Sequence, residues 1–259
     1  MRHTPTGTYA MVREVASTYD RCVRSQSRSV KIDVELARMQ HRHYCRSLEQ
    51  LGLGLVRIRP DVRFPDCCFV EDPAVVIGGV AIVGSMGVPS RVGEERAVKE
   101  AIALYKEVYE LKPPGTLEGG DVLVIDGKVY VGLSRRTNPA GVDAVRAVAG
   151  ESGYAVVPVR ISTALHLKSV CSYLGEDCIL LSRGHFDDGI FSAFKTLVVP
   201  KEEAYASNCL AVNGKVFLPK GYLRAREMVD REGFETAEID ISEFKKGNGG
   251  LTCLSIVFS

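Results

Sequence analysis

The stretch Gly249-Gly250-Leu251-Thr252-Cys253-Leu254-Ser255-Ile256-Val257-Phe258-Ser259 decides how we expect this chain to fold. Its two glycines permit close approach of another backbone or a ligand, and a single cysteine follows them. The run from Leu254 to Phe258 is apolar and β-forming, which indicates a buried strand. Cys253 is therefore expected at the start of a strand and beside a flexible loop, where a scaffold can present a nucleophile. The alternative is an inert buried thiol, because free cysteine is among the most buried residue types.

Upstream of this stretch, β-hairpins recur along the chain. They are predicted to begin at Ala74, Val122, Ser169 and Cys209, at intervals of 40 to 48 residues. Their turns are Gly78-Gly79, Asp126-Gly127, Gly175-Glu176-Asp177 and Asn213-Gly214. A period of this length indicates one repeated supersecondary unit, here hairpin, helix and strand.

The final strand supplies a fifth hairpin if it pairs with the apolar segment Thr8–Val12. Five modules closed by joining the two ends of the chain make a ring, which removes open sheet edges. We therefore predict one α/β domain over residues 1–259, with polar residues at the module ends converging on the central axis.

Apolar periodicity and end signals predict the remaining elements. Asp33 is a plausible N-cap for a helix to Leu51, which Gly52 terminates, with an apolar stripe of Leu36, Met39, Tyr44, Leu48 and Leu51. Further helices are predicted over residues 92–111, 138–151 and 222–232, and from about 187. Single strands are predicted over residues 53–59, 155–159, 196–199 and 236–239. The polar segment 13–30 is either a mobile flap or an ordinary surface loop.

The composition is that of a globular protein. Hydrophobic residues make up 46% and charged residues 25%, and the net charge is +1, so nothing points to nucleic acid or a membrane surface as partner. No apolar run is long enough to span a bilayer. The segment Met1–Gly7 lacks the apolar region of a secretion signal, so we expect a cytoplasmic protein.

Eight cysteines permit disulfides, but a chain of this size is expected to keep reduced, mostly buried thiols. Cys171 and Cys178 flank a turn, and a disulfide between these two is left open. His41, His43 and Cys45 lie close in sequence, but on a helix they are not expected to share a face as zinc ligands do. We therefore expect no metal and no organic cofactor.

Four polar clusters lie beside the module strands. The first, Pro65–Asp72, places Asp66, Glu71 and Asp72 among apolar residues. Unpaired carboxylates in apolar surroundings are costly, and a planar guanidinium would satisfy them bidentately. Capping and turn formation are the alternative roles.

The second cluster, Thr116–Asp121, contains Glu118 beside paired glycines, and Glu118 could orient a histidine. Asp121 could cap the same loop. The third cluster contains His166 at a strand entrance, where a hydrogen-bonded core histidine is the alternative. The fourth is the segment that ends in Cys253.

Arg91 and Arg136 follow the first and second hairpins. Their forked guanidinium groups suit a substrate carboxylate, and the alternative is a solvated surface position.

Together these clusters resemble the dimethylarginine dimethylaminohydrolase family, within the guanidino-group-modifying superfamily that also contains arginine deiminases and amidinotransferases. The resemblance covers nearly the whole chain and rests on the order and spacing of Phe64–Asp72, Thr116–Asp121, Gly132–Asn138, Leu165–Ser169 and Leu251–Ser255. It implies a pseudo-symmetric α/β propeller of five ββαβ modules around a central active site, in agreement with the repeat described above.

The resemblance also implies roles. Cys253 would be the nucleophile, His166 the general acid and base, and Glu118 the residue that orients His166. The implied substrate contacts are Asp72 and Glu71 for the guanidinium, and Asp66, Arg91 and Arg136 for the amino-acid end. Lys168 is a further implied substrate contact. It stands where arginine deiminases have a guanidinium-binding aspartate, which favours the dimethylarginine-type hydrolases.

The expected reaction converts an Nω-methylated arginine to citrulline and a methylamine through an S-alkylthiouronium on Cys253, without a cofactor. An arginine deiminase, an arginine or agmatine hydrolase, and a guanidino-binding protein without turnover remain alternatives. A cysteine-protease-like hydrolase is disfavoured, because an amide carbonyl offers no cation for the acidic cluster. The expected partner is a small guanidino substrate, and a homodimer is left open. Gly247-Asn248 and the segment 15–19 depart from the family pattern, which concerns substrate identity more than reaction type.

Overall fold

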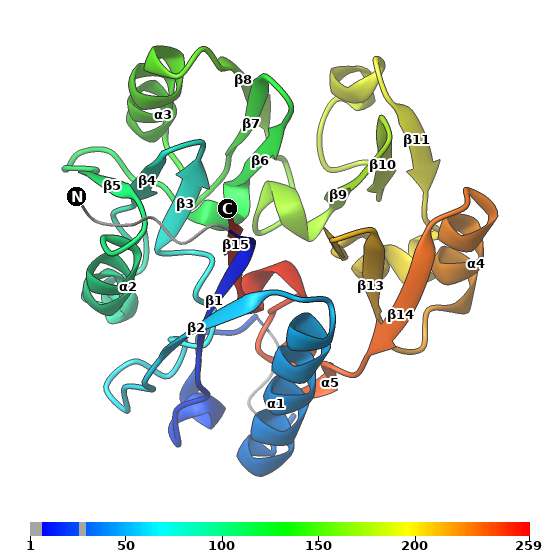
Figure 1. Ribbon diagram of the computed structural model, residues 1–259, viewed down its shortest axis with the longest axis horizontal. Helices are drawn as coiled ribbons and strands as arrows, with labels where there is room; N and C mark the ends of the chain where they lie inside the picture. Colours follow the sequence, from blue (N-terminus) through cyan, green and yellow to red (C-terminus); the bar gives the residue numbers. More distant parts are fainter. Residues whose placement is uncertain (1–6, 26–29) are drawn as a thin grey trace.

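The strands of the protein form a ring of small sheets in a computed structural model that describes residues 7–25 and 30–259 (Figure 1). Over these residues there are five three-stranded sheets. In each sheet an antiparallel pair is extended by a third strand, parallel to the central strand of the sheet. The predicted five-module α/β propeller is therefore confirmed.

The two ends of the chain close the ring as expected. β1 (Tyr9–Arg13) pairs antiparallel with β15 (Ile256–Phe258), and β2 (Gly54–Ile58) completes this sheet in parallel. In this register Tyr9 faces Phe258, and their rings stack at 5.8 Å. The strand is shorter than predicted, because Thr252–Leu254 forms a 3₁₀ turn in front of it.

The other sheets repeat this arrangement along the chain. Their strands are β3 (Ala74–Ile77), β4 (Val80–Val83) and β5 (Glu107–Glu110); β6 (Val122–Ile125), β7 (Lys128–Leu133) and β8 (Ala155–Arg160); β9 (Cys171–Gly175), β10 (Cys178–Leu181) and β11 (Lys195–Val198); and β12 (Leu210–Val212), β13 (Lys215–Pro219) and β14 (Glu235–Ile239). The four predicted hairpins are confirmed.

Helices surround the ring of sheets (Figure 1). They are α1 (Val34–Gln50), α2 (Glu95–Ile102), α3 (Pro139–Glu151), α4 (Leu223–Arg231) and α5 (Ser242–Lys246). Asp33 caps α1 by accepting a hydrogen bond from the Leu36 amide at 3.0 Å, as predicted. The predicted apolar stripe is wrong at Met39, which is 58% exposed, because the buried face of α1 runs instead through Ala37, Tyr44 and Leu48.

The helix predicted over residues 92–111 is wrong. α2 ends at Ile102, and the chain continues into β5, which pairs in parallel with β4. Glu107, Tyr109 and Glu110 of β5 are exposed, so this edge strand lacks the apolar alternation that identifies a half-buried strand. The helix expected from residue 187 is only a short 3₁₀ segment, Asp188–Phe191. α5 and the 3₁₀ segment Lys201–Ser207 were not predicted.

The surface-loop interpretation of segment 13–30 is wrong for its first half. Tyr19 and Cys22 are buried, and the ring of Tyr19 packs against Phe69 and Phe244 at 5.9 and 5.5 Å between centroids. Val23 then donates its amide to both carboxylate oxygens of Asp66 at 3.1 Å. The first half of the segment is therefore part of the core, and residues 26–29 lie outside the described residues.

All eight cysteines are free and buried. Cys171 lies opposite Leu181 and Cys178 opposite Gly175, so the pairing left open above does not form. On α1 the Sγ atom of Cys45 lies 3.7 Å from Nδ1 of His41, so these two do share a face, contrary to expectation. His43 is exposed and does not join them. Among the helices of the described residues, none has the length and apolar character needed to cross a membrane.

Two segments that carry site residues cross at Gly119. A Cβ atom at this position would lie 2.2 Å from the backbone oxygen of Glu71 and 2.7 Å from that of Ala74. Because backbone cannot move aside as a side chain can, we expect Gly119→Ala to lower the free energy of unfolding by about 3 kcal/mol. Gly150→Ala is the matched control: a Cβ atom added at Gly150 in α3 would meet no neighbouring atom of the described residues within 4 Å, and alanine there should stabilise by about 0.5 kcal/mol. Urea unfolding measures both, and equal stability of Gly119→Ala and wild type would contradict the crossing.

Candidate active site

Loops from several modules meet around a small cavity. The cavity measures about 30 Å³ and is lined by Val23, Asp66, Phe69, Asp72, Arg91, Arg136, Leu165, His166, Gly247, Asn248, Gly249 and Cys253. Six of the residues singled out in the sequence are among them: Asp66, Asp72, Arg91, Arg136, His166 and Cys253. The fold therefore brings together residues that are up to 187 positions apart, from Asp66 to Cys253.

Cys253 sits in the 3₁₀ turn that precedes β15 and is 9% exposed. Its Sγ atom accepts a hydrogen bond from the Gly250 amide at 3.3 Å, and its carbonyl oxygen accepts one from the Glu71 amide at 3.3 Å. Burial raises the pKa of the Cys253 thiol, and the carboxylates of Glu71 and Asp72 raise it further. A cation bound beside Asp72 would oppose this effect and favour the thiolate.

The glycines before Cys253 make room for neighbouring side chains of the protein. A Cβ atom on Gly249 would lie 2.2 Å from the ring of Phe69, and one on Gly250 would lie 2.3 Å from Oδ1 of Asn208. Phe69 and Gly249 both line the cavity, so this packing shapes its wall.

His166 is buried and forms a close pair with Glu118. Its Nε2 atom lies 2.8 Å from Oε2 of Glu118. Burial alone would lower the pKa of His166, but the charge of Asp72 and the hydrogen bond to Glu118 outweigh it and raise this pKa to about 9. Burial likewise opposes ionisation of Glu118, but its hydrogen bond with His166 lowers the pKa of Glu118 to about 2. The pair is therefore an imidazolium and a carboxylate at neutral pH, and His166 has a proton to give.

Asp72 and Arg91 form a buried ion pair next to His166. Nη1 of Arg91 donates to Oδ2 of Asp72 at 2.6 Å, while Nε and Nη2 of Arg91 donate to Oε2 of Glu94 at 3.1 and 2.8 Å. The surface interpretation of Arg91 is thus wrong. Within the described part of the chain, Oδ1 of Asp72 has no hydrogen-bond partner, and Nδ1 of His166 lies 3.9 Å away. An unsatisfied carboxylate oxygen in a buried site can accept an N–H group of a guanidinium ligand.

Arg136 pairs with Glu118, the hydrogen-bond partner of His166. Its Nη1 atom donates to both carboxylate oxygens of Glu118, at 3.1 and 3.3 Å. Asp66 accepts the Val23 amide, and burial raises the pKa of Asp66 while the charge of Arg91 opposes the rise. Arg91 and Arg136 thus form ion pairs with Asp72 and Glu118, the two carboxylates that face His166.

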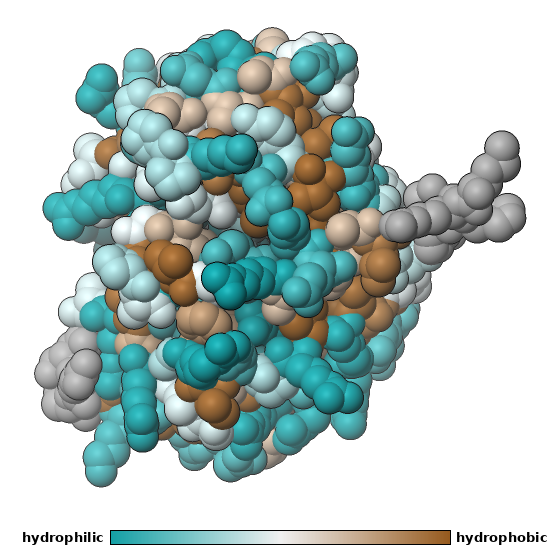
Figure 2. Space-filling model, turned by 90° about the vertical axis from the view of Figure 1, so that its left-hand side faces the viewer, coloured by the Kyte–Doolittle hydropathy of each residue, from teal (hydrophilic) through white to brown (hydrophobic). Residues whose placement is uncertain are grey.

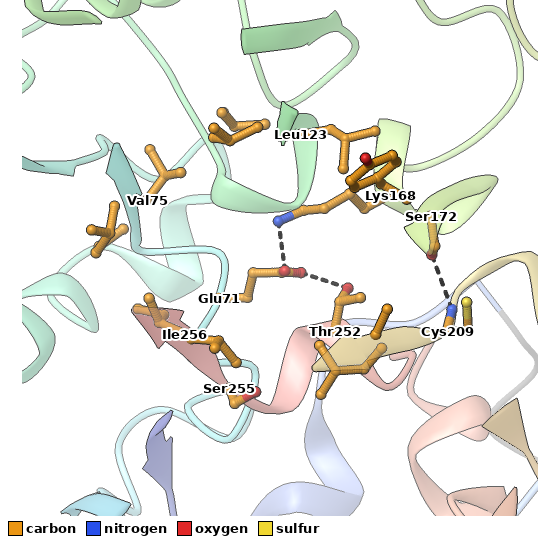
Figure 3. Close-up of a pocket in the computed structure, with 17 residues that line it drawn as sticks. Glu71, Val75, Leu123, Lys168, Ser172, Cys209, Thr252, Ser255 and Ile256 are labelled. Atoms are coloured by element: carbon orange, nitrogen blue, oxygen red, sulfur yellow. Dashed lines mark hydrogen bonds and ion pairs between the residues drawn. The ribbon is translucent and has the colours of Figure 1, made fainter. Parts of the chain in front are cut away.

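Glu71 and Lys168 do not line this cavity. They face a second cavity of about 260 Å³, whose walls come from the inner strands β3, β6, β9, β12 and β15 (Figure 3). Nζ of Lys168 lies 2.6 Å from Oε1 of Glu71, and the hydroxyl of Thr252 donates to Oε2 of Glu71 at 2.9 Å. Glu71 and Asp72 are adjacent in sequence but their side chains serve different cavities. The arrangement therefore does not support the expectation that Glu71 and Lys168 contact the substrate.

Three buried side chains of the site were missed or only partly interpreted in the sequence. Glu94 orients Arg91. Asp121, expected only as a loop cap, accepts the Leu167 amide at 3.0 Å and so fixes the residue that follows His166. Asn208 contacts the segments of both His166 and Cys253. A buried glutamate three residues after Arg91 and an asparagine next to a hairpin carry no motif, so only the fold reveals them.

Asp72, Glu118 and His166 could in principle hold a metal ion, since one ligand atom from each lies within 4.8 Å of the others. Arg91 and Arg136 already pair with the two carboxylates, so Oδ1 of Asp72 is the one oxygen of these carboxylates without a partner among the described residues, whereas a metal ion needs three or four ligand atoms. The chemistry of this site therefore fits an organic cation held by Asp72 better than a resident metal.

The structure combines a buried thiol, a histidine paired with a glutamate and an aspartate with one oxygen unpartnered among the described residues, in a five-module propeller. These are features that the resemblance to the guanidino-group-modifying superfamily implies. Comparison with known proteins narrows this class. A family model described as "N,N dimethylarginine dimethylhydrolase, eukaryotic" matches residues 7–215. The N(G),N(G)-dimethylarginine dimethylaminohydrolase of Pseudomonas aeruginosa is 36% identical over 230 residues, which cover 88% of this chain and 91% of the relative.

Solved structures give the same result. A dimethylarginine dimethylaminohydrolase carrying a histidine-to-glycine substitution, in an adduct with S-methyl-L-thiocitrulline, superposes with a TM-score of 0.92 at 34% identity, over 96% of this chain and 99% of that one. A cysteine-to-serine variant of the Pseudomonas aeruginosa enzyme in complex with citrulline gives a TM-score of 0.91 at 33% identity, over 96% and 98% of the two chains. This chain belongs to the dimethylarginine dimethylaminohydrolase family.

Proposed function

We propose that this protein hydrolyses Nω-methylated arginine to citrulline and a methylamine. The observation that carries the proposal is that Cys253, His166 and Asp72 line one cavity. His166 is hydrogen-bonded to Glu118, and Oδ1 of Asp72 has no partner among the described residues. The family supports it, because relatives have been captured with citrulline and with an S-methyl-L-thiocitrulline adduct.

In the proposed reaction the substrate guanidinium binds to Asp72. Its positive charge lowers the pKa of the Cys253 thiol, which burial and the charges of Glu71 and Asp72 otherwise raise. The thiolate attacks the central guanidinium carbon and forms the C–S bond. Dimethylamine leaves with a proton from His166, because an amide anion is too poor a leaving group. The product of this step is an S-alkylthiouronium on Cys253.

The second half of the reaction uses the same histidine as a base. Neutral His166 removes a proton from water, which attacks the thiouronium carbon. The C–S bond then breaks, the hydroxyl proton of the tetrahedral intermediate passes to the departing sulfur of Cys253, and citrulline is released. Glu118 keeps His166 oriented and stabilises its charged form throughout.

The amino-acid end of the substrate is assigned to Asp66, Arg91 and Arg136. In the structure Arg91 forms an ion pair with Asp72, and Arg136 forms one with Glu118. A substrate carboxylate offers both arginines a bidentate partner, and a substrate guanidinium replaces Arg91 at Asp72. Binding of the substrate is therefore proposed to exchange internal ion pairs for equivalent pairs with the ligand.

A panel of arginine, monomethylarginine, asymmetric dimethylarginine and agmatine tests the proposal. We expect citrulline and dimethylamine in equal amounts from asymmetric dimethylarginine, measured by amino-acid analysis and amine chromatography. Release of ammonia from arginine at a higher kcat/KM would assign the protein to the deiminase type instead. Binding of these compounds without any product would leave a guanidino-binding protein.

Three expectations remain predictions: a single domain, a cytoplasmic location and a homodimer.

On the face that carries α2 and α3, hydrophobic residues form several groups separated by hydrophilic ones (Figure 2). Exposed apolar side chains along this stretch of the chain include Val92, Leu104 and Tyr109.

A further inference from the structure

One buried amide side chain connects the segments that carry the nucleophile and the base. Asn208 follows the 3₁₀ segment Lys201–Ser207 and is 4% exposed. Its Nδ2 atom donates to the carbonyl oxygen of Lys168 at 2.8 Å and to the hydroxyl of Thr252 at 3.0 Å. Its Oδ1 atom accepts the Thr252 amide at 3.2 Å. Lys168 lies two residues after His166, and Thr252 immediately precedes Cys253.

The orientation of this amide is fixed by its partners. Turning the side chain over would place its oxygen against the carbonyl of Lys168 and its NH₂ group against the amide of Thr252, so two hydrogen bonds would become repulsive contacts. The backbone has made room for it in this orientation, since a Cβ atom on Gly250 would lie 2.3 Å from Oδ1 of Asn208. Hydrogen bonds with Lys168 and Thr252 therefore hold the Asn208 side chain in one orientation.

The contacts of Asn208 continue into a closed network. The Thr252 hydroxyl accepts a hydrogen bond from Asn208. It donates to Glu71, and Glu71 in turn pairs with Lys168 (Figure 3). The Glu71 amide donates to the carbonyl of Cys253. Every polar group in this loop of contacts has a partner, which favours a single rigid arrangement of the three segments.

We propose that Asn208 is a positioning residue, which sets the separation of the Cys253 sulfur from the His166 imidazole. The inference rests on the proposed function. Both groups must reach the same guanidinium carbon and its leaving nitrogen, and a misplacement of about 1 Å can cost on the order of 10²-fold in rate. Asn208 itself does not line the substrate cavity, so its loss should affect the chemical step more than binding.

The variants Asn208→Asp and Asn208→Ala test this role. Aspartate keeps the size and one acceptor but loses both N–H donors, and alanine loses all three contacts. We expect kcat to fall on the order of 10²-fold in both variants, with KM within about threefold of wild type. Thr252→Val, which removes the hydroxyl that Asn208 and Glu71 share, should lower kcat in the same manner.

Ser207→Ala is the matched control. Ser207 is buried next to Asn208, and its hydroxyl donates to the carbonyl of Ala204 at 2.6 Å, with a longer contact to the carbonyl of Ser169 at 3.5 Å. Unlike Asn208, it does not connect to the Cys253 segment. We expect its kcat to stay within about twofold of wild type even if its melting temperature falls.

A second measurement does not depend on turnover. The rate at which iodoacetamide alkylates Cys253, followed by peptide mass spectrometry across pH, reports the environment of the thiol. We expect the midpoint of this profile to move to higher pH in Asn208→Asp and to be unchanged in Ser207→Ala. Failure of the wild type to hydrolyse methylated arginines would overturn the proposed function while leaving this comparison intact. Folded Asn208 variants with wild-type kcat and a wild-type alkylation profile would overturn the positioning role.

Discussion

Replacing Cys253 with serine is expected to lower kcat by on the order of 10⁴-fold or more, while the substrate still binds. The thiol is buried against the Gly250 amide and beside Asp72, so a bound guanidinium can make it a thiolate. The same environment cannot generate an alkoxide, whose parent hydroxyl is a far weaker acid. Citrulline formation at saturating dimethylarginine measures the loss, and calorimetric titration measures binding.

Cys178→Ser is the matched control for this prediction. Cys178 is also a free, buried cysteine, but it lies in β10 and packs in the core with Leu180 and Val216. We expect its kcat to stay within about twofold of wild type and only its stability to fall. Near-normal turnover by Cys253→Ser would remove Cys253 from the chemical step.

The second large effect is on the pH dependence of kcat/KM, which should fall as pH rises through about 9. His166 must be protonated to release the amine, and its pKa is raised to about 9 because the charges of Asp72 and Glu118 outweigh the effect of burial. In Glu118→Gln the carboxylate is lost while burial remains. The alkaline limb of the profile should therefore move to lower pH, by at least about one unit.

The same shift has a consequence for stability. A histidine whose pKa is raised by folding stabilises the folded state fully below its unfolded value, and this contribution disappears as pH rises through about 9. Glu118→Gln should reduce that pH-dependent part of the free energy of unfolding. A control such as Glu49→Gln, where the glutamate pairs with Arg57 on the surface, should leave the rate profile unchanged. An alkaline limb that stays in place in Glu118→Gln would contradict the pairing of His166 with Glu118.

The ring could be predicted from the sequence because its signals are local. The hairpin turns are marked by glycine, asparagine and aspartate, and the strands around them are apolar on both sides. The closure of β1 against β15 followed from counting modules and was confirmed. β5 could not be predicted, because Glu107 and Glu110 face solvent at the edge of a sheet and only pairing with β4 makes the segment a strand.

The sequence predicted which residues gather near the site, but not the direction in which each side chain points. Cys253, His166 and Asp72 line one cavity, whereas Glu71 and Lys168, equally prominent in the sequence, line another. Position in the sequence does not tell which of the two cavities a side chain in an irregular loop faces. Asn208 and Glu94 escaped notice because their importance comes from contacts across the ring, which no local pattern encodes.

A rapid-quench experiment tests the proposed chemistry most directly. Enzyme and asymmetric dimethylarginine are mixed, quenched in acid at early times, digested and analysed by mass spectrometry. We predict a transient adduct on the peptide that contains Cys253, with the mass of the substrate less dimethylamine, that forms before citrulline and decays as citrulline is released. Citrulline formation without any adduct, or an adduct only on another of the eight cysteines, would contradict covalent catalysis by Cys253.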